Sequence, residues 1–367
     1  MAGFNGTVGA LLRKKYVNSR MIRMKYMFAA LLTLLGCSGK GYKDLDVASF
    51  EEIAAGQEVA VLDVRTADEY AAGHLQWASN VDWNADGFME KVSAQYPKET
   101  PLALYCRSGR RSADAAAKLS KAGYTVYNLL GGYIAWTEAG KPVNTYAVET
   151  FFTSSGLPVA ITLIKHGTLA LKYKAQTFHI DPVGGYGKPT DYADEFPKAD
   201  YIIVTHEHGD HFDREAIAAL TEDGRTTLIT NARCAEILGY GTVMANGDNL
   251  ALPCEVFLQA VPAYNYTDGR TMFHPKGRDN GFVLSMDGLR IYIAGDTEDI
   301  PEMAKLKGID VAFLPVNQPY TMTVDQCVRA ATVIGPKVLI PYHFSQTDLS
   351  DLPRRLTGID VRLRDMQ

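Results

Sequence analysis

The chain has few cysteines, no long apolar run and no excess of basic residues, and each shortage excludes a class of protein. Its 367 residues include five cysteines, an odd number, and no two of them have C-x-x-C spacing. A disulfide-stapled scaffold and a zinc ribbon are therefore not expected. No apolar run reaches the roughly 20 residues of a membrane-spanning helix. The formal net charge of −5 argues against nucleic acid as a partner, because phosphate binding requires a basic face.

What is present is the composition of a folded protein large enough for two domains. Hydrophobic residues make up 47% of the chain and charged residues 22%, which is typical of globular proteins. From Tyr42 to about Pro142 strand-like and helical segments alternate, which predicts a parallel sheet covered by helices. From about Val159 the pattern predicts mixed sheets with outer helices. We expect domains at 42–145 and 152–367.

The first 40 residues predict an export signal. Residues 1–26 hold six basic residues and no acidic one, and the short apolar run Met27–Leu35 follows, as in a signal peptide. The segment Leu34–Cys37 (LLGC) resembles the lipobox of bacterial lipoproteins. This resemblance implies a lipid anchor at Cys37 and a protein exported to the cell envelope. The alternative is a cytosolic protein with an apolar N-terminal helix.

A cysteine lies at the turn between a predicted strand and a predicted helix. The segment Cys106–Ser112 reads CRSGRRS. The N–H groups of a helix N-terminus carry partial positive charge and favour an anion, and three arginines add full charges. We expect this turn to stabilise a thiolate. The alternative is a buried cysteine that acts as a small hydrophobic residue.

This segment resembles the active-site loop of single-domain rhodaneses, which are sulfurtransferases. Two further segments, Asp63–Leu75 (DVRTADEYAAGHL) and Gly131–Trp136 (GGYIAW), resemble other motifs of that family. The resemblance implies that Cys106 is a catalytic nucleophile that carries sulfur from a donor such as thiosulfate or a persulfide. The persulfide cradle would comprise Arg107, Ser108, Gly109, Arg110 and Arg111. Glu69 is expected to be a surface residue of a helix.

The densest run of metal-binding residue types is His206–His211 (HEHGDH). It holds three of the eight histidines and two acidic residues within six positions. Imidazole and carboxylate without thiolate suit Zn²⁺, Fe²⁺ or Mn²⁺. After a strand, His206 and His208 point the same way, whereas Asp210 and His211 turn back toward a second position. The run predicts a metal centre.

The run resembles the H-x-H-x-D-H signature of the metallo-β-lactamase fold. The segments Asp181-Pro182, Ala294–Thr297 (AGDT) and Ile340–Phe344 (IPYHF) resemble later motifs of that family. The resemblance implies an α/β fold in which a rhodanese-like parallel sheet domain is followed by an αββα metallo-β-lactamase sandwich. It also implies metal-assisted hydrolysis. The details are most similar to ascorbate-6-phosphate lactonase-like zinc hydrolases.

The ligands follow from this resemblance. One site would take His206 and His208, the other Asp210, His211 and His343, and Asp296 would bridge them. Asp210 is also expected to orient the attacking water. We expect one or two Zn²⁺ ions, with Fe²⁺ or Mn²⁺ as alternatives.

The chain departs from the family at the loop that usually supplies a further histidine to the first site. The corresponding stretch Val261–Asn265 (VPAYN) has none. His274, the histidine nearby, is left as a ligand, a substrate contact or neither. Tyr264, Asn265 and His274 are expected to line the substrate site. His166 is either a pocket residue or structural, and His179 is expected to be structural.

We expect a membrane-tethered two-domain protein that hydrolyses a small ester, lactone, amide or phosphodiester and carries a sulfurtransferase domain. One alternative is sulfur oxidation of the persulfide dioxygenase type, with mononuclear iron. Another is an envelope sensor without enzymatic activity. The substrate, the metal and the oligomeric state stay open.

Overall fold

A computed structural model describes residues 41–366. The predicted signal segment and the predicted anchor Cys37 lie outside the described residues. Among the residues that are described, no helix has both the length and the apolar character needed to cross a membrane.

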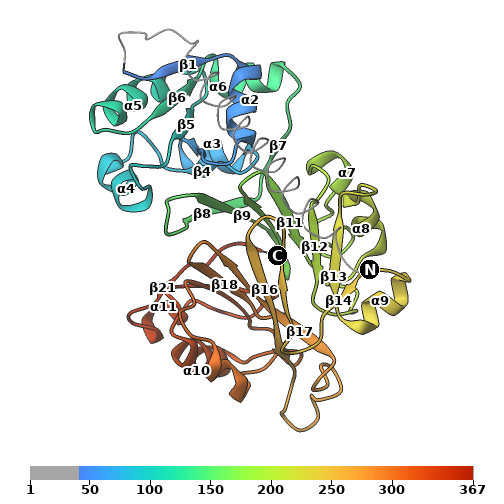
Figure 1. Cartoon of the computed structure of the whole chain (residues 1–367). Coiled ribbons are helices and arrows are strands. Elements are labelled where there is room, and N and C mark those ends of the chain that lie inside the picture. Colours follow the sequence, from blue (N-terminus) through green and yellow to red (C-terminus); the bar gives the residue numbers. More distant parts are fainter. Residues whose placement is uncertain (1–40, 367) are drawn as a thin grey trace, which may run out of the picture. The chain divides into compact units, whose positions relative to one another are not determined.

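The first domain is an α/β unit built on a parallel sheet (Figure 1). Its strand order is β1–β6–β5–β2–β4, with bounds β1 (Lys43–Leu45), β2 (Ala60–Asp63), β4 (Ser79–Asn80), β5 (Leu102–Tyr105) and β6 (Val126–Leu129). The helices are α2 (Val47–Ala55), α3 (Ala67–Ala71), α4 (Phe88–Gln95), α5 (Arg110–Lys121) and α6 (Gly132–Glu138). A short antiparallel pair joins β3 (His74–Leu75) to β7 (Val143–Asn144). Every residue of β2, β5 and β6 is buried, as in parallel sheets that helices cover.

The second domain contains two seven-stranded mixed sheets. The first has the order β14–β13–β12–β11–β10–β9–β8, with bounds β8 (Ala147–Phe152), β9 (Pro158–Lys165), β10 (Thr168–Tyr173), β11 (Gln176–Ile180), β12 (Tyr201–Val204), β13 (Thr227–Thr230) and β14 (Thr242–Val243). The second runs from β15 to β21 in chain order, with bounds β15 (Asn249–Ala251), β16 (Val256–Ala263), β17 (Asp279–Met286), β18 (Leu289–Ile293), β19 (Val311–Pro315), β20 (Val338–Tyr342) and β21 (Asp360–Val361).

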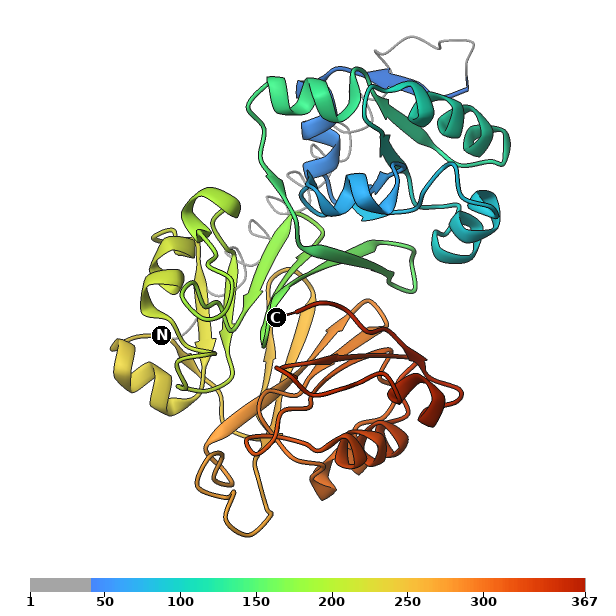
Figure 2. The same ribbon diagram turned by 180° about the vertical axis from the view of Figure 1, so that it is seen from behind.

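Helices cover the outer face of each of these two sheets. The first sheet carries α7 (Tyr192–Glu195), α8 (Arg214–Leu220) and α9 (Ala232–Leu238). The second carries the 3₁₀ helix η1 (Pro301–Lys305), α10 (Val324–Ile334) and α11 (Leu352–Arg355). Figure 2 shows the same layers from behind, with the long connection between β16 and β17 extending from one edge.

Alternation along the strands builds this sandwich. In β18, Ile291 and Ile293 enter the core between the sheets, whereas Tyr292 packs under the helices. In β10, Leu169 and Leu171 face the same inter-sheet core and Ala170 faces the opposite way. Each strand thus supplies both layers, because successive side chains point to opposite faces. The predicted fold class, a parallel α/β domain followed by an αββα sandwich, is confirmed.

Candidate metal centre

The histidine-rich run follows directly from the end of β12. A buried carboxylate, that of Asp181 at the end of the neighbouring β11, fixes its start: Thr205 donates to Asp181 from its backbone N and from Oγ1, both at 2.7 Å. The same carboxylate lies 2.8 Å from His211 Nδ1. Asp181 therefore orients the run at both ends and leaves His211 Nε2 to point inward.

Other segments bring further donors from far along the chain. Asp296 follows β18, His343 follows β20, and His166 occupies the turn between β9 and β10. The backbone N of His343 donates to the carbonyl of His166 at 3.0 Å. Both histidines have positive φ, 45° at His166 and 47° at His343. Non-glycine residues rarely adopt this conformation, and such strain concentrates at functional sites.

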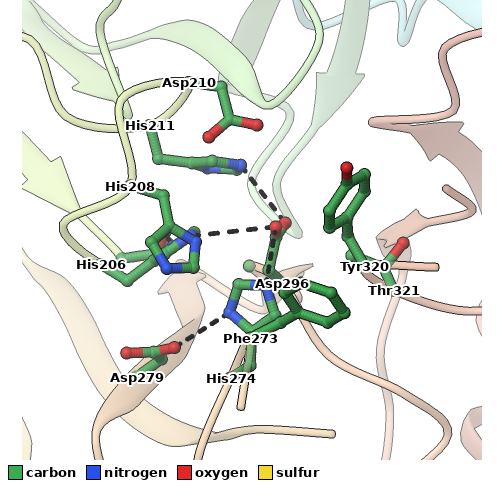
Figure 3. A network of polar contacts seen from close by, with 12 residues as sticks. His206, His208, Asp210, His211, Phe273, His274, Asp279, Asp296, Tyr320 and Thr321 are labelled. Carbon is green, nitrogen blue, oxygen red and sulfur yellow. Dashed lines mark hydrogen bonds and ion pairs between the residues drawn. The ribbon is translucent and has the colours of Figure 1, made fainter. Parts of the chain in front are cut away.

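These donors form two adjacent groups whose ligand atoms lie within 4.8 Å of one another. The first group is His206, His208, His274 and Asp296, and the second is His166, Asp210, His211 and His343. All six ligands expected from the sequence are brought together, and His274 and His166 join them. Figure 3 shows His206, His208, His211 and His274 arranged around Asp296.

Asp296 belongs to the first group and also contacts the second. Its Oδ2 is 3.3 Å from His274 Nε2 and 3.8 Å from His206 Nε2. It is also 3.2 Å from His343 Nε2, and Oδ1 is 3.3 Å from His211 Nε2. One carboxylate thus contacts imidazoles of both groups, which is the position expected for a bridging ligand.

His274 enters from the connection between β16 and β17. The backbone N of Asn265 donates to its carbonyl at 2.8 Å, which folds this connection back on itself. Its Nδ1 lies 3.0 Å from Asp279 Oδ2. This side chain therefore occupies the place beside His206 and His208 that the missing loop histidine left open. In the sequence, the feature that could have indicated His274 as a ligand was Asp279, an acidic residue five positions later that can orient an imidazole.

From the sequence, His166 was either a pocket residue or a structural one. The structure places it against the second group. Its ring centroid lies 3.7 Å from that of His343, and its Nε2 is 3.2 Å from Asp210 Oδ2. The next residue is Gly167, and a larger residue there would clash with the metal centre, because its Cβ would lie 2.5 Å from His211 Cε1. His179 differs from these residues. It is buried between Tyr192 and Phe196, and burial lowers its pKa to about 3.

The donor set fits divalent metal ions. In the described part of the chain, His211 Nε2, His343 Nε2 and Asp296 Oδ1 are buried and make no hydrogen bond. Buried polar atoms without partners are costly, and three of them converge here. Although burial opposes ionisation, the imidazoles around Asp296 hold the pKa of this carboxyl well below its usual range. Imidazole and carboxylate donors at this spacing are ligands that Zn²⁺ accepts.

The other two residues expected at the substrate site lie at the start of the connection between β16 and β17, where their side chains bond to other parts of the protein. Tyr264 is buried, and its hydroxyl donates to Glu302 Oε2 at 2.8 Å. Asn265 is also buried, and its Nδ2 donates to the carbonyl of Tyr320 at 2.6 Å. A contact of either side chain with substrate stays a prediction.

In the first domain, Cys106 lies between β5 and α5. It is buried, and Ser112 Oγ donates to its Sγ at 3.4 Å. Gly109 adopts φ 87° at the helix N-cap. Gly132 of the last motif packs against the same loop, because a Cβ there would lie 2.3 Å from the carbonyl O of Cys106.

Glu69 lies on α3 with a side chain that is 30% exposed, as expected of a surface residue of a helix, and it also makes a contact that the sequence did not predict. Its carboxylate forms a two-pronged ion pair with Arg111 of the cysteine loop, at 2.8 and 2.7 Å. It also completes a capping box with Thr66 at the start of α3. These contacts, led by the hydrogen bond from Arg111, lower the pKa of Glu69 to about 2.

The comparisons with known proteins agree with this geometry. Residues 160–343 match the β-lactamase superfamily domain, and residues 46–139 match the rhodanese-like domain. The first match spans half of the chain, and the protein therefore belongs to the β-lactamase superfamily. It is a metal-dependent hydrolase of the metallo-β-lactamase fold that also carries a rhodanese-like domain.

Its relatives include UPF0173 metal-dependent hydrolases. It is 31% identical over 219 residues to that of Archaeoglobus fulgidus, a match that covers 55% of this chain and 94% of the relative. It is 34% identical over 169 residues to that of Pyrococcus abyssi, covering 43% and 70%. A crystal structure from Parabacteroides distasonis, named as a metal-dependent hydrolase, is 50% identical with a TM-score of 0.58, covering 60% of this chain and all of that one.

Proposed function

We propose that the second domain hydrolyses a small carbonyl or phosphoryl compound, such as an ester, lactone, amide or phosphodiester, with two zinc ions. The observation that carries this proposal is the pair of adjacent four-donor groups, of which the first includes Asp296, whose carboxylate also reaches His211 and His343 of the second. When bound, zinc supplies Lewis acidity, which makes a coordinated water more acidic and polarises the substrate. Fe²⁺ and Mn²⁺ also suit these donors. Membership of the ascorbate-6-phosphate lactonase branch stays a prediction.

The two carboxylates have different tasks in this proposal. The Asp296 side chain is 3% exposed and lies among four imidazoles, so it holds the two groups together. The Asp210 side chain is 26% exposed. Its Oδ2 lies 3.2 Å from His166 Nε2 and 3.5 Å from His343 Nε2. We assign Asp210 the orientation of the attacking water, which would donate a hydrogen bond to its carboxylate.

Elemental analysis combined with a panel of hydrolase substrates tests this function. The purified protein is expected to hold about two zinc ions per chain, and His208→Ala should lose both metal and hydrolysis. Cys106→Ser serves as the matched control, because it removes the thiol of the other domain and should retain both. Oxygen uptake with glutathione persulfide by an iron-loaded protein would instead support sulfur oxidation and contradict the proposal.

For the first domain, we propose sulfur transfer through a persulfide on Cys106. The loop that follows this cysteine ends at the N-terminus of α5, whose N–H groups favour an anion. Transfer of sulfur from thiosulfate to cyanide is the measurement. Cys106→Ser should abolish it, while His208→Ala should retain it. A domain that binds thiosulfate without turnover would overturn this proposal.

We also propose that the protein is exported and lipid-anchored at Cys37. The support is the order of a basic segment, a short apolar run and the LLGC sequence. In a bacterial host, labelled palmitate should be incorporated into the full chain and not into Cys37→Ser. A chain that stays unlabelled in the cytosolic fraction would refute the anchor.

A further inference from the structure

Three aromatic side chains stand at the metal centre and have no part in holding metal. Tyr186 lies against the second group, with its ring centroid 4.6 Å from that of His166. Phe273 directly precedes His274, and its ring centroid lies 5.0 Å from that of Tyr320 in an edge-to-face arrangement (Figure 3). We call these three residues the aromatic rim.

The two tyrosines of the rim are exposed and Phe273 is half-buried, although the neighbouring ligands are buried. Tyr186 is 41% exposed and Tyr320 is 46% exposed. The neighbouring ligands His211 and His343 are almost fully buried. Large exposed aromatic surfaces next to a buried polar centre are typical of ligand sites, where a bound molecule covers them.

Hydrogen bonds of buried side chains hold the rim in place. Asn265 Nδ2 donates to the carbonyl of Tyr320 at 2.6 Å. Lys165, which is buried, donates from Nζ to the carbonyls of Gly184 and Lys188, at 2.8 and 2.6 Å, on either side of Tyr186. A rigid rim loses little conformational entropy when it binds a ligand.

The basic side chains on the loops around the site already pair with neighbouring acids or a hydroxyl group. Arg278 pairs with Asp279 and Glu207, Lys276 with Glu302, and Arg270 with Glu298. Lys188 donates to Thr145 and lies over the ring of Tyr146. The stretches 205–213 and 343–351, which follow β12 and β20, contain no lysine or arginine.

A phosphorylated substrate would therefore find no arginine or lysine on these two stretches, and on the other loops only basic side chains that already have a partner. Recognition of phosphate groups normally uses such side chains. A planar, uncharged group, in contrast, can stack on or pack edge-on against the tyrosine and phenylalanine rings.

We propose that the aromatic rim selects uncharged carboxylic esters, lactones or amides whose acyl part is aromatic, and disfavours phosphate esters. This proposal rests on the hydrolase function above and narrows its substrate class. For an ester, the water oxygen forms a bond to the carbonyl carbon and the acyl C–O bond breaks. The carboxylic acid and the alcohol are released, and the alcohol takes up a proton from the water.

Matched substrates test the rim in the zinc-loaded full chain. Ethyl benzoate and ethyl cyclohexanecarboxylate share a leaving group and differ in the aromatic character of the acyl part, and bis(4-nitrophenyl) phosphate reports phosphodiester cleavage. Tyr320→Leu keeps apolar bulk and removes the ring. It should raise KM for the benzoate about 5- to 10-fold, which is what one aromatic contact contributes, and change KM for the cyclohexyl ester less than twofold. Tyr186→Leu should act in the same direction.

The controls separate the rim from the metal centre. Zinc content and the thermal unfolding midpoint should match wild type in both variants. Tyr240→Leu, which removes another half-exposed tyrosine, should leave both KM values unchanged. Equal losses on both esters, or a wild type that prefers the phosphodiester, would overturn the proposed selectivity while leaving a hydrolase. A zinc-loaded wild type that cleaves neither these three compounds nor a lactone or an amide would overturn the hydrolase function itself and the rim proposal with it.

Discussion

At the scale of single residues, the metal centre depends on acids that touch no metal position. Asp279 Oδ2 lies 3.0 Å from His274 Nδ1, and Arg278 Nε donates to Asp279 Oδ1 at 2.6 Å. Arg278 Nη1 in turn lies 3.2 Å from Glu207 Oε1, between His206 and His208 in the chain. His274 comes from a long connection, and this chain of charges fixes its ring as a carboxylate fixes many metal-binding histidines.

Asp279→Asn should therefore weaken one of the two zinc sites. Loss of the carboxylate removes the charge that orients His274 and makes its Nε2 a better donor. We expect about 10-fold weaker binding of one zinc equivalent, measured by competition with a chelator. Glu255→Gln, at an exposed acid paired with Lys174, is the control and should bind both ions as wild type does. Two unchanged affinities in Asp279→Asn would contradict a role for this acid.

At the scale of elements, the strands could be predicted but the loops between them could not. Strand-like segments were identifiable because burial imposes a simple pattern on a strand, and β12, β18 and β20 are strands of the mixed sheets expected from about Val159. The ligands that directly follow those strands, such as His206, Asp296 and His343, were expected from their motifs. His274 and His166 were not, since a connection and a tight turn have no periodicity that encodes their path.

The need for glycine in the GGYIAW motif could not be predicted from the sequence either, because it arises only where two elements pack together. Gly132 at the start of α6 has φ 60°, and a Cβ there would meet the carbonyl of Cys106 at 2.3 Å and the backbone N of Gly109 at 2.7 Å. The motif therefore requires glycine because α6 lies too close to the cysteine loop for a side chain. Glu69 likewise contacts this loop from α3, 42 positions before Arg111.

Gly132→Ala should disrupt sulfur transfer more than a comparable change elsewhere. The added methyl group must push the cysteine loop away, so we expect loss of most persulfide transfer and destabilisation by more than 2 kcal/mol, from a clash added to about 1–2 kcal/mol of left-handed strain. Gly140→Ala is the matched control, since Gly140 has φ 67° and no atom within 4 Å of its added Cβ. In urea unfolding, this variant should lose only the free energy that the left-handed strain costs, and it should keep the transfer activity. Similar effects of the two changes would argue against the packing account.

At the scale of the whole molecule, the order of motifs in the sequence was enough to predict both domains. Three segments of the first domain and four of the second recur in the order that each fold requires, and each lies at a strand end in the structure. The number of donors around each metal position was harder to predict, because it depends on which side chains the two sheets of the sandwich bring together. That assembly also sets the charge balance of the second domain.

Without metal, this charge balance makes the stability of the protein depend on pH. Burial alone would lower the pKa of His211, His274 and His343, but the carboxylates beside them outweigh it and raise all three, that of His274 to about 9. Since an unfolded histidine has a pKa near 6.5, the folded metal-free chain binds more protons between pH 6.5 and 9. Its free energy of unfolding then falls as the pH rises from 6.5 through this window, by about 1.4 kcal/mol per pH unit for each proton.

Chelator-treated protein should thus unfold at progressively lower urea concentration at pH 6.5, 7.5 and 8.5. Saturating zinc should remove this decline, because the ions replace the protons between the carboxylates and bind more tightly as the imidazoles deprotonate. Asp296→Asn, which removes the shared carboxylate, should show a shallower decline than wild type in the metal-free state. A metal-free wild type whose urea midpoint is constant across the window would show that the imidazoles are neutral there, and that Asp296 is balanced by some other charge.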